Sequence, residues 1–544
     1  MTTDQSLVAI EDPASDTAAR RQARRCLLAN LTALEQSQPA VAAELRRQSL
    51  PAIPDANGPM EWVFARDGSL TVRADPSQWW GGSSLPLRVG RSLMKSLDLQ
   101  GAIGCLLAPR TAGQIRAALE HIAVNQAFAV IFPDSTIALL NLHCDDFSSE
   151  ILAGRLWFLC GDDWDAQLAA LLQTHPGLCV PQQYIRTGLL SDAEVTAMTT
   201  RGNVILAAET DRRAAMANDI RARTSQRTKS GRICVVAGSN FALWDLAGWA
   251  LTDLLKADGR FRILDKDRPV SASPLALAMA AQECDAIVAA DLFRADLPGV
   301  APDSMPWITW VTNPHIPAPQ PQSPGDRLLL ADPAWQATAT AAGWSAERLA
   351  LAGWPTLVEP TPSPANGPLA LIADAAIAPP PPRLGDFSSH LVLWEKIADE
   401  LTANPLALGN DIEAYLASRM AELEIKGALD QTLFREKLIL PAWRRGITRR
   451  LLAASLHVAL FGAGWSDAEE FAPHAQGQIL TIDDLRRAAR LAAAIVQPIP
   501  ADHAHPAFAL GRPVMRPIAA ARGKVSFPPQ APPLAAEVIV GLLA

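Results

Sequence analysis

Two short stretches near the end of the chain carry residue types that could hold an anion. Gly462 and Gly464 follow an apolar run and would let the backbone approach a ligand closely, with Trp465 beside them. Further on, His503 and His505 lie in a polar loop directly before a proline, which suits the first position of a helix. Backbone N–H groups at a helix start, together with imidazoles, can bind a diphosphate. Simple turn glycines and surface histidines are the alternative interpretation.

A second strand–loop–helix pattern lies in the middle of the chain. Gly238, Ser239 and Asn240 come directly after a clean apolar strand pattern, and Asn313 follows another one. We expect these residues to take part in ligand binding as well. The loop does not read GxGxxG, so the sequence lacks a dinucleotide-binding fingerprint.

Group transfer to a hydroxyl acceptor needs a general base, and three residues of the same region are candidates. They are Asp245, Asp291 and His315. The sequence does not choose among them. Three basic residues could meet donor phosphates, or could be solvated helix charges: Lys437, Arg444 and Arg445.

Two acidic pairs offer a competing, metal-dependent mechanism. Asp163 and Asp165 flank one residue after an apolar run, as do Asp265 and Asp267. Such a pair can hold a divalent cation against nucleotide phosphates, although this spacing is common by chance. HExxH, GxSxG, a Walker loop and a Cys/His cluster are all missing from the sequence. The sequence therefore offers no motif for a bound metal or cofactor, and we expect neither.

The elements that would position these residues alternate between strands and helices. In the last part of the chain we predict a strand at 456–461, a helix at 483–494, and strands at 494–496 and 513–515. In the middle part we predict strands at 233–237, 262–264, 286–288, 307–311 and 328–331. Each series is typical of a Rossmann-like half. The four prolines at 379–382 would form a stiff linker between the two halves.

The N-terminal part predicts a further α/β domain. A helix is expected before residue 51, a hairpin around Asp67 and Gly68, and a helix that Thr111 caps. Short apolar runs predict strands at 102–107, 127–132, 156–160 and 178–181. Residues 192–223 read as a long helix that connects this domain to the rest.

Composition limits the class of protein. The 544 residues carry a net charge of −8, which argues against nucleic acid as the main partner. The seven cysteines form no CxxC motif and several lie in apolar runs, as expected of thiols in a reducing compartment. The sequence shows no signal peptide pattern and no apolar run of about 18 residues. We expect a cytoplasmic protein without a membrane span, and the oligomeric state, a homo-oligomer included, stays open.

The order of motifs in residues 230–544 resembles CgeB-like glycosyltransferases of the GT-B class. The shared features are FGAGW at 461–465, Gly477, and ALGRPV at 509–514. The resemblance implies a pair of Rossmann-like domains that move a sugar from a nucleotide-sugar to a protein or glycan, without a metal. The family often has a donor-binding Glu after the polar loop, where this chain has Ala507 and Phe508. The N-terminal domain is similar to that of motility accessory factors, which glycosylate flagellin.

The fold prediction is therefore α/β, with a GT-B-like pair of Rossmann-like domains and an additional N-terminal α/β domain. The expected segments are a helical start at 1–54, an α/β domain at 55–200, a helical connector at 201–229, and lobes at 230–370 and 371–544, the last binding the nucleotide-sugar. Two other functions stay open: a catalytically inactive binding or scaffold module, which the missing Glu favours, and a nucleotide-sugar epimerase.

Overall fold

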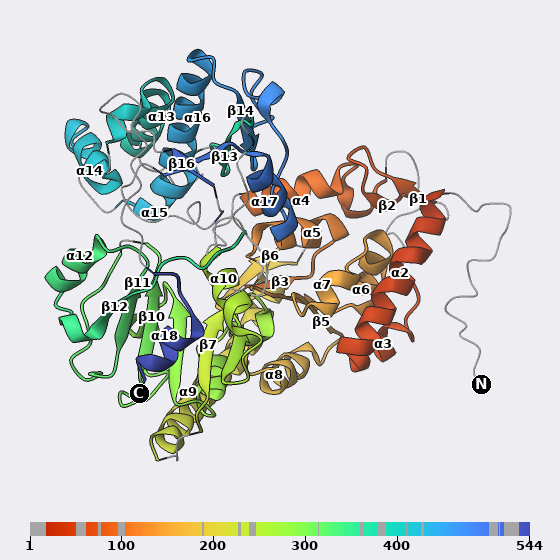
Figure 1. The fold of residues 1–544 in the computed structure, drawn as a ribbon. Coiled ribbons are helices and arrows are strands. Elements are labelled where there is room, and N and C mark those ends of the chain that lie inside the picture. The colour runs from red at the N-terminus through yellow and green to blue at the C-terminus, as the bar shows by residue number, and fades with distance from the viewer. Residues whose placement is uncertain are drawn as a thin grey trace. The chain divides into compact units, whose positions relative to one another are not determined.

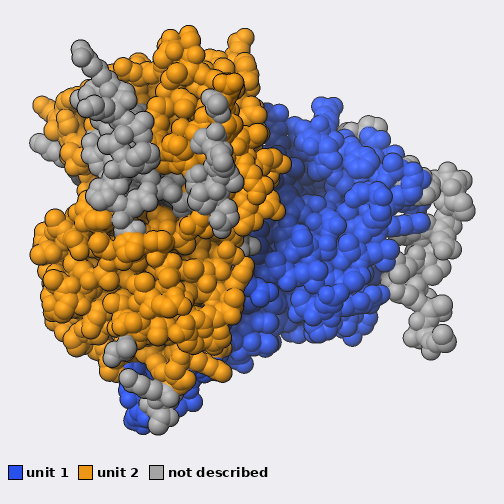
Figure 2. Space-filling model, in the orientation of Figure 1, with its two compact units in different colours: residues 1–227, 264–283, 299–302 blue, residues 228–263, 284–298, 303–544 orange. Residues whose placement is uncertain are grey.

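The computed structural model describes residues 18–50, 61–73, 78–95, 104–123, 125–187, 190–226, 230–238, 246–313, 315–358, 364, 366–378, 380, 388–409, 411–425, 429–499, 510, 512–515 and 532–543. By its contacts the chain divides into two compact units, coloured separately in Figure 2. Unit 1 comprises Met1–Arg227, Leu264–Glu283 and Gly299–Pro302; unit 2 comprises Thr228–Ile263, Cys284–Pro298 and Asp303–Ala544. The finer five-part division stays a prediction.

Unit 1 contains a four-stranded parallel sheet in the order β5-β4-β3-β6 (Figure 1). Its strands are β3 Gly104–Leu107, β4 Phe128–Phe132, β5 Leu156–Cys160 and β6 Gln183–Arg186. The first three lie in the apolar runs that predict strands, and those predictions are confirmed. The hairpin is confirmed as well, with β1 Glu61–Phe64 antiparallel to β2 Leu70–Arg73.

Helices cover both faces of this sheet, because alternate strand residues point to opposite sides. Leu106 packs with the first group of helices, whereas Cys105 and Leu107 pack with the second group. The first group is α2 Ala18–Ser37, α3 Pro39–Leu45, α5 Ala112–His121, α6 Ser135–Cys144 and α7 Ser148–Leu152. The second group is α8 Trp164–Thr174 and the long helix α9 Asp192–Ser225. The remaining helices of unit 1 are α4 Pro86–Lys95 and α11 Pro274–Ala281.

Two local predictions for unit 1 are wrong. Residues 178–181 form no strand, because Pro181 has no N–H to give to a ladder; Leu178 is instead buried in an apolar cluster and the strand begins at Gln183. The N-terminal helix is not continuous either. It ends at Ser37, and Pro39 opens α3 after Gln38 has left helical geometry.

Unit 2 contains two sheets. The first has six strands in the order β12-β11-β10-β9-β7-β8. They are β7 Ile233–Ala237, β8 Phe261–Asp265, β9 Ala286–Ala290, β10 Trp307–Val311, β11 Arg327–Leu330 and β12 Leu349–Leu351. All five predicted strands are confirmed. The helices that accompany them in the chain are α10 Leu246–Leu255 and α12 Trp335–Ala341.

The second sheet has four parallel strands in the order β14-β13-β15-β16. They are β13 Leu369–Ile372, β14 Val458–Phe461, β15 Ala494–Val496 and β16 Val514–Met515. Its helices are α13 Ser388–Ala403, α14 Ile412–Glu422, α15 Gln431–Phe434, α16 Leu440–Ala453 and α17 Ile482–Leu491. A π-helical turn, η8 Arg435–Ile439, joins α15 to α16. The short helix α18 Ala536–Gly541 comes last.

Strand β13 was not predicted, and it changes the role expected of the prolines. It pairs with both β14 and β15, so it is a central strand of the second sheet. The four prolines at 379–382 follow β13 in the chain and therefore do not link the two sheets. That link is formed by residues between β12 and β13. Within the described residues, no helix is long and apolar enough to cross a bilayer.

Candidate functional site

Each of the three larger sheets has one point where the chain order of its strands reverses. Ligands of open parallel sheets bind beside such a point, outside the carboxyl ends of the strands. The reversal lies between β3 and β6 in unit 1, between β7 and β9 in the first sheet of unit 2, and between β13 and β15 in the second. The loops that follow these strands are therefore the places to look for functional side chains.

The edge of the first sheet of unit 2 carries Gly238 and Asp291, which follow β7 and β9. The carbonyl of Gly238 accepts a hydrogen bond of 2.6 Å from the Thr252 hydroxyl. Asp291 adopts a left-handed conformation, with φ of 48°, and its N–H donates to the Trp310 carbonyl at 2.9 Å. A non-glycine residue in this region is uncommon.

The carboxylate of Asp291 is engaged by the next loop along the sheet. It accepts hydrogen bonds from the Thr312 N–H at 2.7 Å and from the Thr312 hydroxyl. Burial raises the pKa of Asp291, and hydrogen bonds from Thr312 and Asn313 act against that rise. The Asn313 side chain in turn accepts the N–H of His315 at 3.1 Å, and His315 is exposed. The structure thus brings Asp291, Asn313 and His315 together.

At the edge of the second sheet, two arginines of α16 reach the loops that leave the strands. Arg444 donates to the carbonyl of Pro498 at 2.9 Å and to that of Asp374 at 2.7 Å. Pro498 follows β15 and Asp374 follows β13, so Arg444 bridges the point where strand order reverses. Arg445 donates to the carbonyl of Ala375 at 2.8 Å. Neither guanidinium forms an ion pair with a carboxylate that the structure describes.

In this arrangement the guanidinium groups of Arg444 and Arg445 are partly buried. Burial lowers the pKa of Arg444 to about 10, and burial also lowers the pKa of Arg445. Arg444 stays protonated at neutral pH, because a pKa of about 10 lies well above 7. The hydrogen bonds of both guanidinium groups go to carbonyl groups, and nearby carboxylates, among them Asp374 and Glu436 for Arg444, offset their charge only from a distance. An anion that enters the edge would therefore stabilise them further. The expectation that Arg444 and Arg445 are solvated helix charges does not hold.

The glycines of the FGAGW motif pack against protein backbone. Gly462 and Gly464 have φ values of 127° and 84°. A Cβ on Gly462 would lie 2.5 Å from the Ala373 carbonyl oxygen, and one on Gly464 would lie 2.3 Å from the Ala376 nitrogen. Trp465 is buried and donates its indole N–H to the same Ala373 carbonyl at 2.8 Å. The motif therefore holds the loop after β13 in place, and donor binding by these residues stays a prediction.

Five of the predicted site residues lie outside the described part of the chain. They are Ser239, Asn240, Asp245, His503 and His505. Their assignments stay predictions.

Carboxylates of both acidic pairs have partners within the protein. Asp165 is paired with Arg201 at 2.8 Å, and Asp163 accepts a hydrogen bond from Gln167 at 2.8 Å. Asp265 accepts the N–H of Asp267 at 3.0 Å. Across the described ranges, no group of three or more His, Cys, Asp or Glu side chains is arranged to hold a metal ion.

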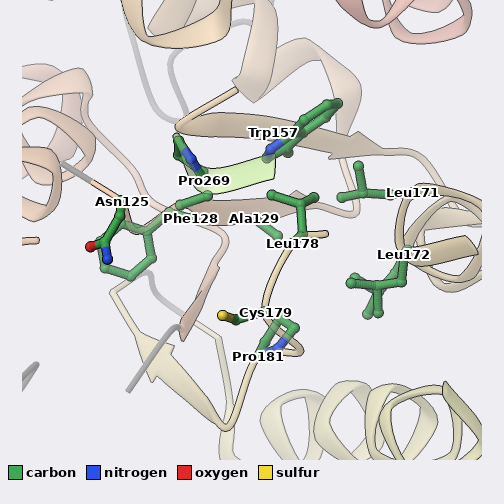
Figure 3. Close-up of a pocket in the computed structure, with 12 residues that line it drawn as sticks. Asn125, Phe128, Ala129, Trp157, Leu171, Leu172, Leu178, Cys179, Pro181 and Pro269 are labelled. Atoms are coloured by element: carbon green, nitrogen blue, oxygen red, sulfur yellow. The ribbon is translucent and has the colours of Figure 1, made fainter. Parts of the chain in front are cut away.

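Unit 1 also has an apolar pocket at the amino ends of β4 and β5 (Figure 3). Trp157, Leu171, Leu172 and Leu178 line it, and its empty space, open to solvent, is about 350 Å³. Cys179 is its one thiol, and burial raises the pKa of that thiol. The pocket lies at the end of the sheet opposite the carboxyl edge and brings no pair of titratable groups together.

Sequence reasoning missed Asp374 and underrated Arg444. The run that precedes Asp374, LALIA at 369–373, is an apolar segment that ends in an acidic residue, as many strand ends do. That signal could have identified β13. Nothing in the sequence shows which face of α16 meets the sheet edge, because basic residues occur on several faces of that helix.

No protein-family model matches the chain, and no curated protein matches it. Among solved structures, the MAf glycosyltransferase from Magnetospirillum magneticum AMB-1 aligns with this chain at 14% identity and a TM-score of 0.24. The alignment covers 53% of this chain and 53% of that one, so it spans about half of each. The chain is thus an α/β protein with three largely parallel sheets and a weak structural similarity to a glycosyltransferase.

Proposed function

We propose that the protein is a cytoplasmic glycosyltransferase of the GT-B class, as the order of its motifs implies. The two sheets of unit 2 would act as its two lobes. The second sheet would bind the diphosphate of a nucleotide-sugar at its carboxyl edge. The first sheet would present the acceptor, a protein or a glycan, near Asn313 and His315. Transfer would need no metal, because Arg444 and Arg445 supply the positive charge that the donor requires.

The observation that carries the proposal is the placement of Arg444. Its guanidinium lies where the strand order reverses and bridges two exit loops. It forms no ion pair with a described carboxylate, although Glu436 and Asp374 act on it electrostatically from nearby. Guanidinium groups bind phosphate through paired N–H donors, and Arg444 uses only part of its donor set on the two carbonyls. Among the candidate bases, the Asp291 carboxylate is engaged by Thr312, whereas His315 is exposed.

Replacing Arg444 tests the donor site. A hydrogen bond to a charged group contributes about 1.5–3 kcal/mol, so Arg444→Met should weaken nucleoside diphosphate binding about tenfold or more. Arg450→Met is the matched control, because Arg450 lies on the same helix and is exposed. Calorimetry with UDP, GDP and CDP in buffer that contains EDTA measures the affinities. Equal affinity in wild type and Arg444→Met, with equal melting temperatures, would remove the proposed donor site.

A functional assay separates an active enzyme from an inactive binding module. Slow hydrolysis of a nucleotide-sugar by the wild type, reduced in Arg444→Met, is expected of a transferase that lacks its acceptor. Binding without hydrolysis or transfer would favour the module instead.

A further inference from the structure

The apolar pocket of unit 1 has no part in the proposed transfer, and its walls come from several separate segments (Figure 3). These segments are the amino ends of β4 and β5, helix α8, the connection from α8 to β6, and residues 264–283. Side chains from all of them line the pocket, among them Phe128, Trp157, Leu171, Leu178, Cys179 and Pro269. The pocket is therefore a product of the folded unit and not of a local turn.

A buried ion pair that does not itself line the pocket holds two of these walls. Arg213, on α9, is 7% exposed and is paired with Glu209 at 2.6 Å. Its guanidinium donates to the carbonyl of Leu172 at 2.9 Å and to that of Leu178. Leu172 belongs to α8 and Leu178 to the connection that follows it, so Arg213 fixes the spacing of the two walls. Walls held in this way do not readily collapse into the space between them.

The wall from residues 264–283 is fixed just as closely. Two hydrogen bonds from Ser273 tie this segment to residues 176–177, directly before the connection that lines the pocket. A Cβ on Gly177 would lie 1.8 Å from the Val270 carbonyl oxygen, so this approach requires glycine. The contact places Pro269 in the wall of the pocket.

The lining of the pocket is almost entirely apolar. None of the 12 described residues that line it is charged, and their polar side-chain groups are the Asn125 amide and the Cys179 thiol. Trp157 already uses its indole N–H, which donates to the Gly154 carbonyl at 2.8 Å. An ion that entered would lose hydration without gaining an ionic partner, whereas an apolar group would be removed from water favourably.

We propose that this pocket binds a small uncharged molecule whose body is a single ring or a short branched alkyl chain. Its empty space of about 350 Å³ includes the part open to solvent, so a larger body would protrude. Concave, mostly apolar walls with few polar groups are typical of small-molecule sites. The site is independent of the proposed glycosyltransferase activity, because it depends on unit 1 alone.

Fluorine NMR of the full chain with para-fluorophenol tests the site, and para-fluorobenzoate is a charged comparison of similar size. We expect saturable binding of the phenol and about tenfold weaker binding, or less, of the benzoate, whose carboxylate would lose its hydration. Leu171→Trp should largely remove phenol binding, because Leu171 lines the pocket and a larger side chain fills the space. Leu152→Trp is the matched control, since Leu152 is an exposed leucine of unit 1 that does not line the pocket.

The thiol of Cys179 gives a second readout that needs no variant. The other cysteines are buried and Cys179 is half-buried, so a maleimide should label Cys179 first. Labelling is done at alkaline pH, because burial raises the pKa of this thiol. Mass spectrometry of the labelled peptides identifies the site. Saturating para-fluorophenol should slow the labelling of Cys179 several-fold, whereas para-fluorobenzoate at the same concentration should not.

Each result supports or overturns the proposal. Absence of saturable phenol binding by the wild type overturns it, and so does equal phenol affinity of wild type and Leu171→Trp. Phenol binding that leaves the labelling rate of Cys179 unchanged places the ligand elsewhere and counts against the pocket. A Cys179 that resists labelling in the free protein would show a pocket closed to solvent, with the same consequence. If Leu171→Trp does not fold, the labelling experiment decides.

Discussion

Four non-glycine residues in the described chain adopt a positive φ, and they fall into two classes. Glu424 and Ser455 come just after α14 and α16, where a left-handed residue commonly ends a helix. Ala108 and Asp291 instead follow strands β3 and β9, next to points where strand order reverses. A conformation of this kind costs on the order of 1 kcal/mol and persists where the surroundings impose it. Asp291 also accepts the N–H of Thr312, which lies in the neighbouring loop that leaves β10.

A buried histidine gives unit 1 a defined response to acid. His143 is 3% exposed, stacks on Trp62 with ring centroids 5.2 Å apart, and has a ring nitrogen 2.9 Å from the Leu139 carbonyl. Burial lowers its pKa to about 4, below the value near 6.5 of an unfolded chain. Below pH 6.5 the imidazole of residue 143 is protonated in the unfolded chain, whereas in the folded chain it stays neutral until the pH approaches 4. Stability from this group is complete above about pH 6.5 and falls as pH drops toward 4.

We therefore predict a pH-dependent loss of about 3 kcal/mol from His143 between pH 6.5 and 4. Carboxylates titrate in the same range, so the comparison is between wild type and His143→Gln. Urea unfolding at a series of pH values gives the slopes, and the variant should show the shallower one over this window. Parallel pH profiles of the two proteins would mean that His143 accepts its proton normally in the fold.

At the scale of elements, the position of α16 depends on its close contact with α13. Gly446 follows Arg444 and Arg445 directly in α16. A Cβ on this glycine would lie 2.2 Å from the Leu401 carbonyl oxygen of α13. The glycine lets the two helices meet, and the same contact brings Arg444 to the sheet edge. The site on the second sheet thus depends on helix packing as well as on its own side chains.

Gly446→Ala should destabilise the protein by about 1–3 kcal/mol, because the added methyl group overpacks the contact. Better helix propensity offsets at most about 1 kcal/mol of that cost. Gly259→Ala is the control, since a Cβ there meets nothing within 4 Å. Thermal or denaturant unfolding measures the stability of both variants. A stabilised Gly446→Ala would show that α13 and α16 are farther apart than described.

The elements themselves were largely predictable, whereas the side-chain site was not. Apolar runs bounded by polar turns identified β4, β5, β7 and β10 nearly residue by residue, because buried parallel strands are apolar on both faces. Strand β13 is equally apolar, but the prolines after it suggested a linker instead. The role of Arg444 depends on which face of α16 meets a sheet edge that is remote in sequence. Local patterns carry no information on that contact.

At the scale of the whole molecule, the two units are interleaved along the chain. Residues 264–283 belong to unit 1, although they begin at the end of β8 and lead to β9, and both of these strands flank β7 in the first sheet of unit 2. Within unit 1, Ser273 donates its N–H to the Gly177 carbonyl and its hydroxyl to the Pro176 carbonyl, each at 2.9 Å. Helix α11 follows at once, and it packs on α9. Most residues of α11 are buried and apolar.

A fragment of residues 228–544 should therefore fold poorly by itself. It retains α11 but lacks α9 and the 176–177 turn, so apolar surface that is buried in the whole chain becomes exposed. We expect aggregation, or dye binding typical of exposed apolar surface, and a broadened melting transition relative to the whole chain. The control is a fragment in which the exposed apolar side chains of α11 are replaced by polar ones. A cooperative transition in the unmodified fragment, at the temperature of the whole chain, would contradict the prediction.

The chain passes between the units at five places: 227/228, 263/264, 283/284, 298/299 and 302/303. A single recombination event in the gene therefore cannot give one unit to another protein intact, because any one breakpoint leaves part of each unit behind or divides a unit. Shuffling, duplication or loss of either unit would require several coordinated junctions. The two units are consequently expected to be inherited together, and relatives of this protein should carry both or neither.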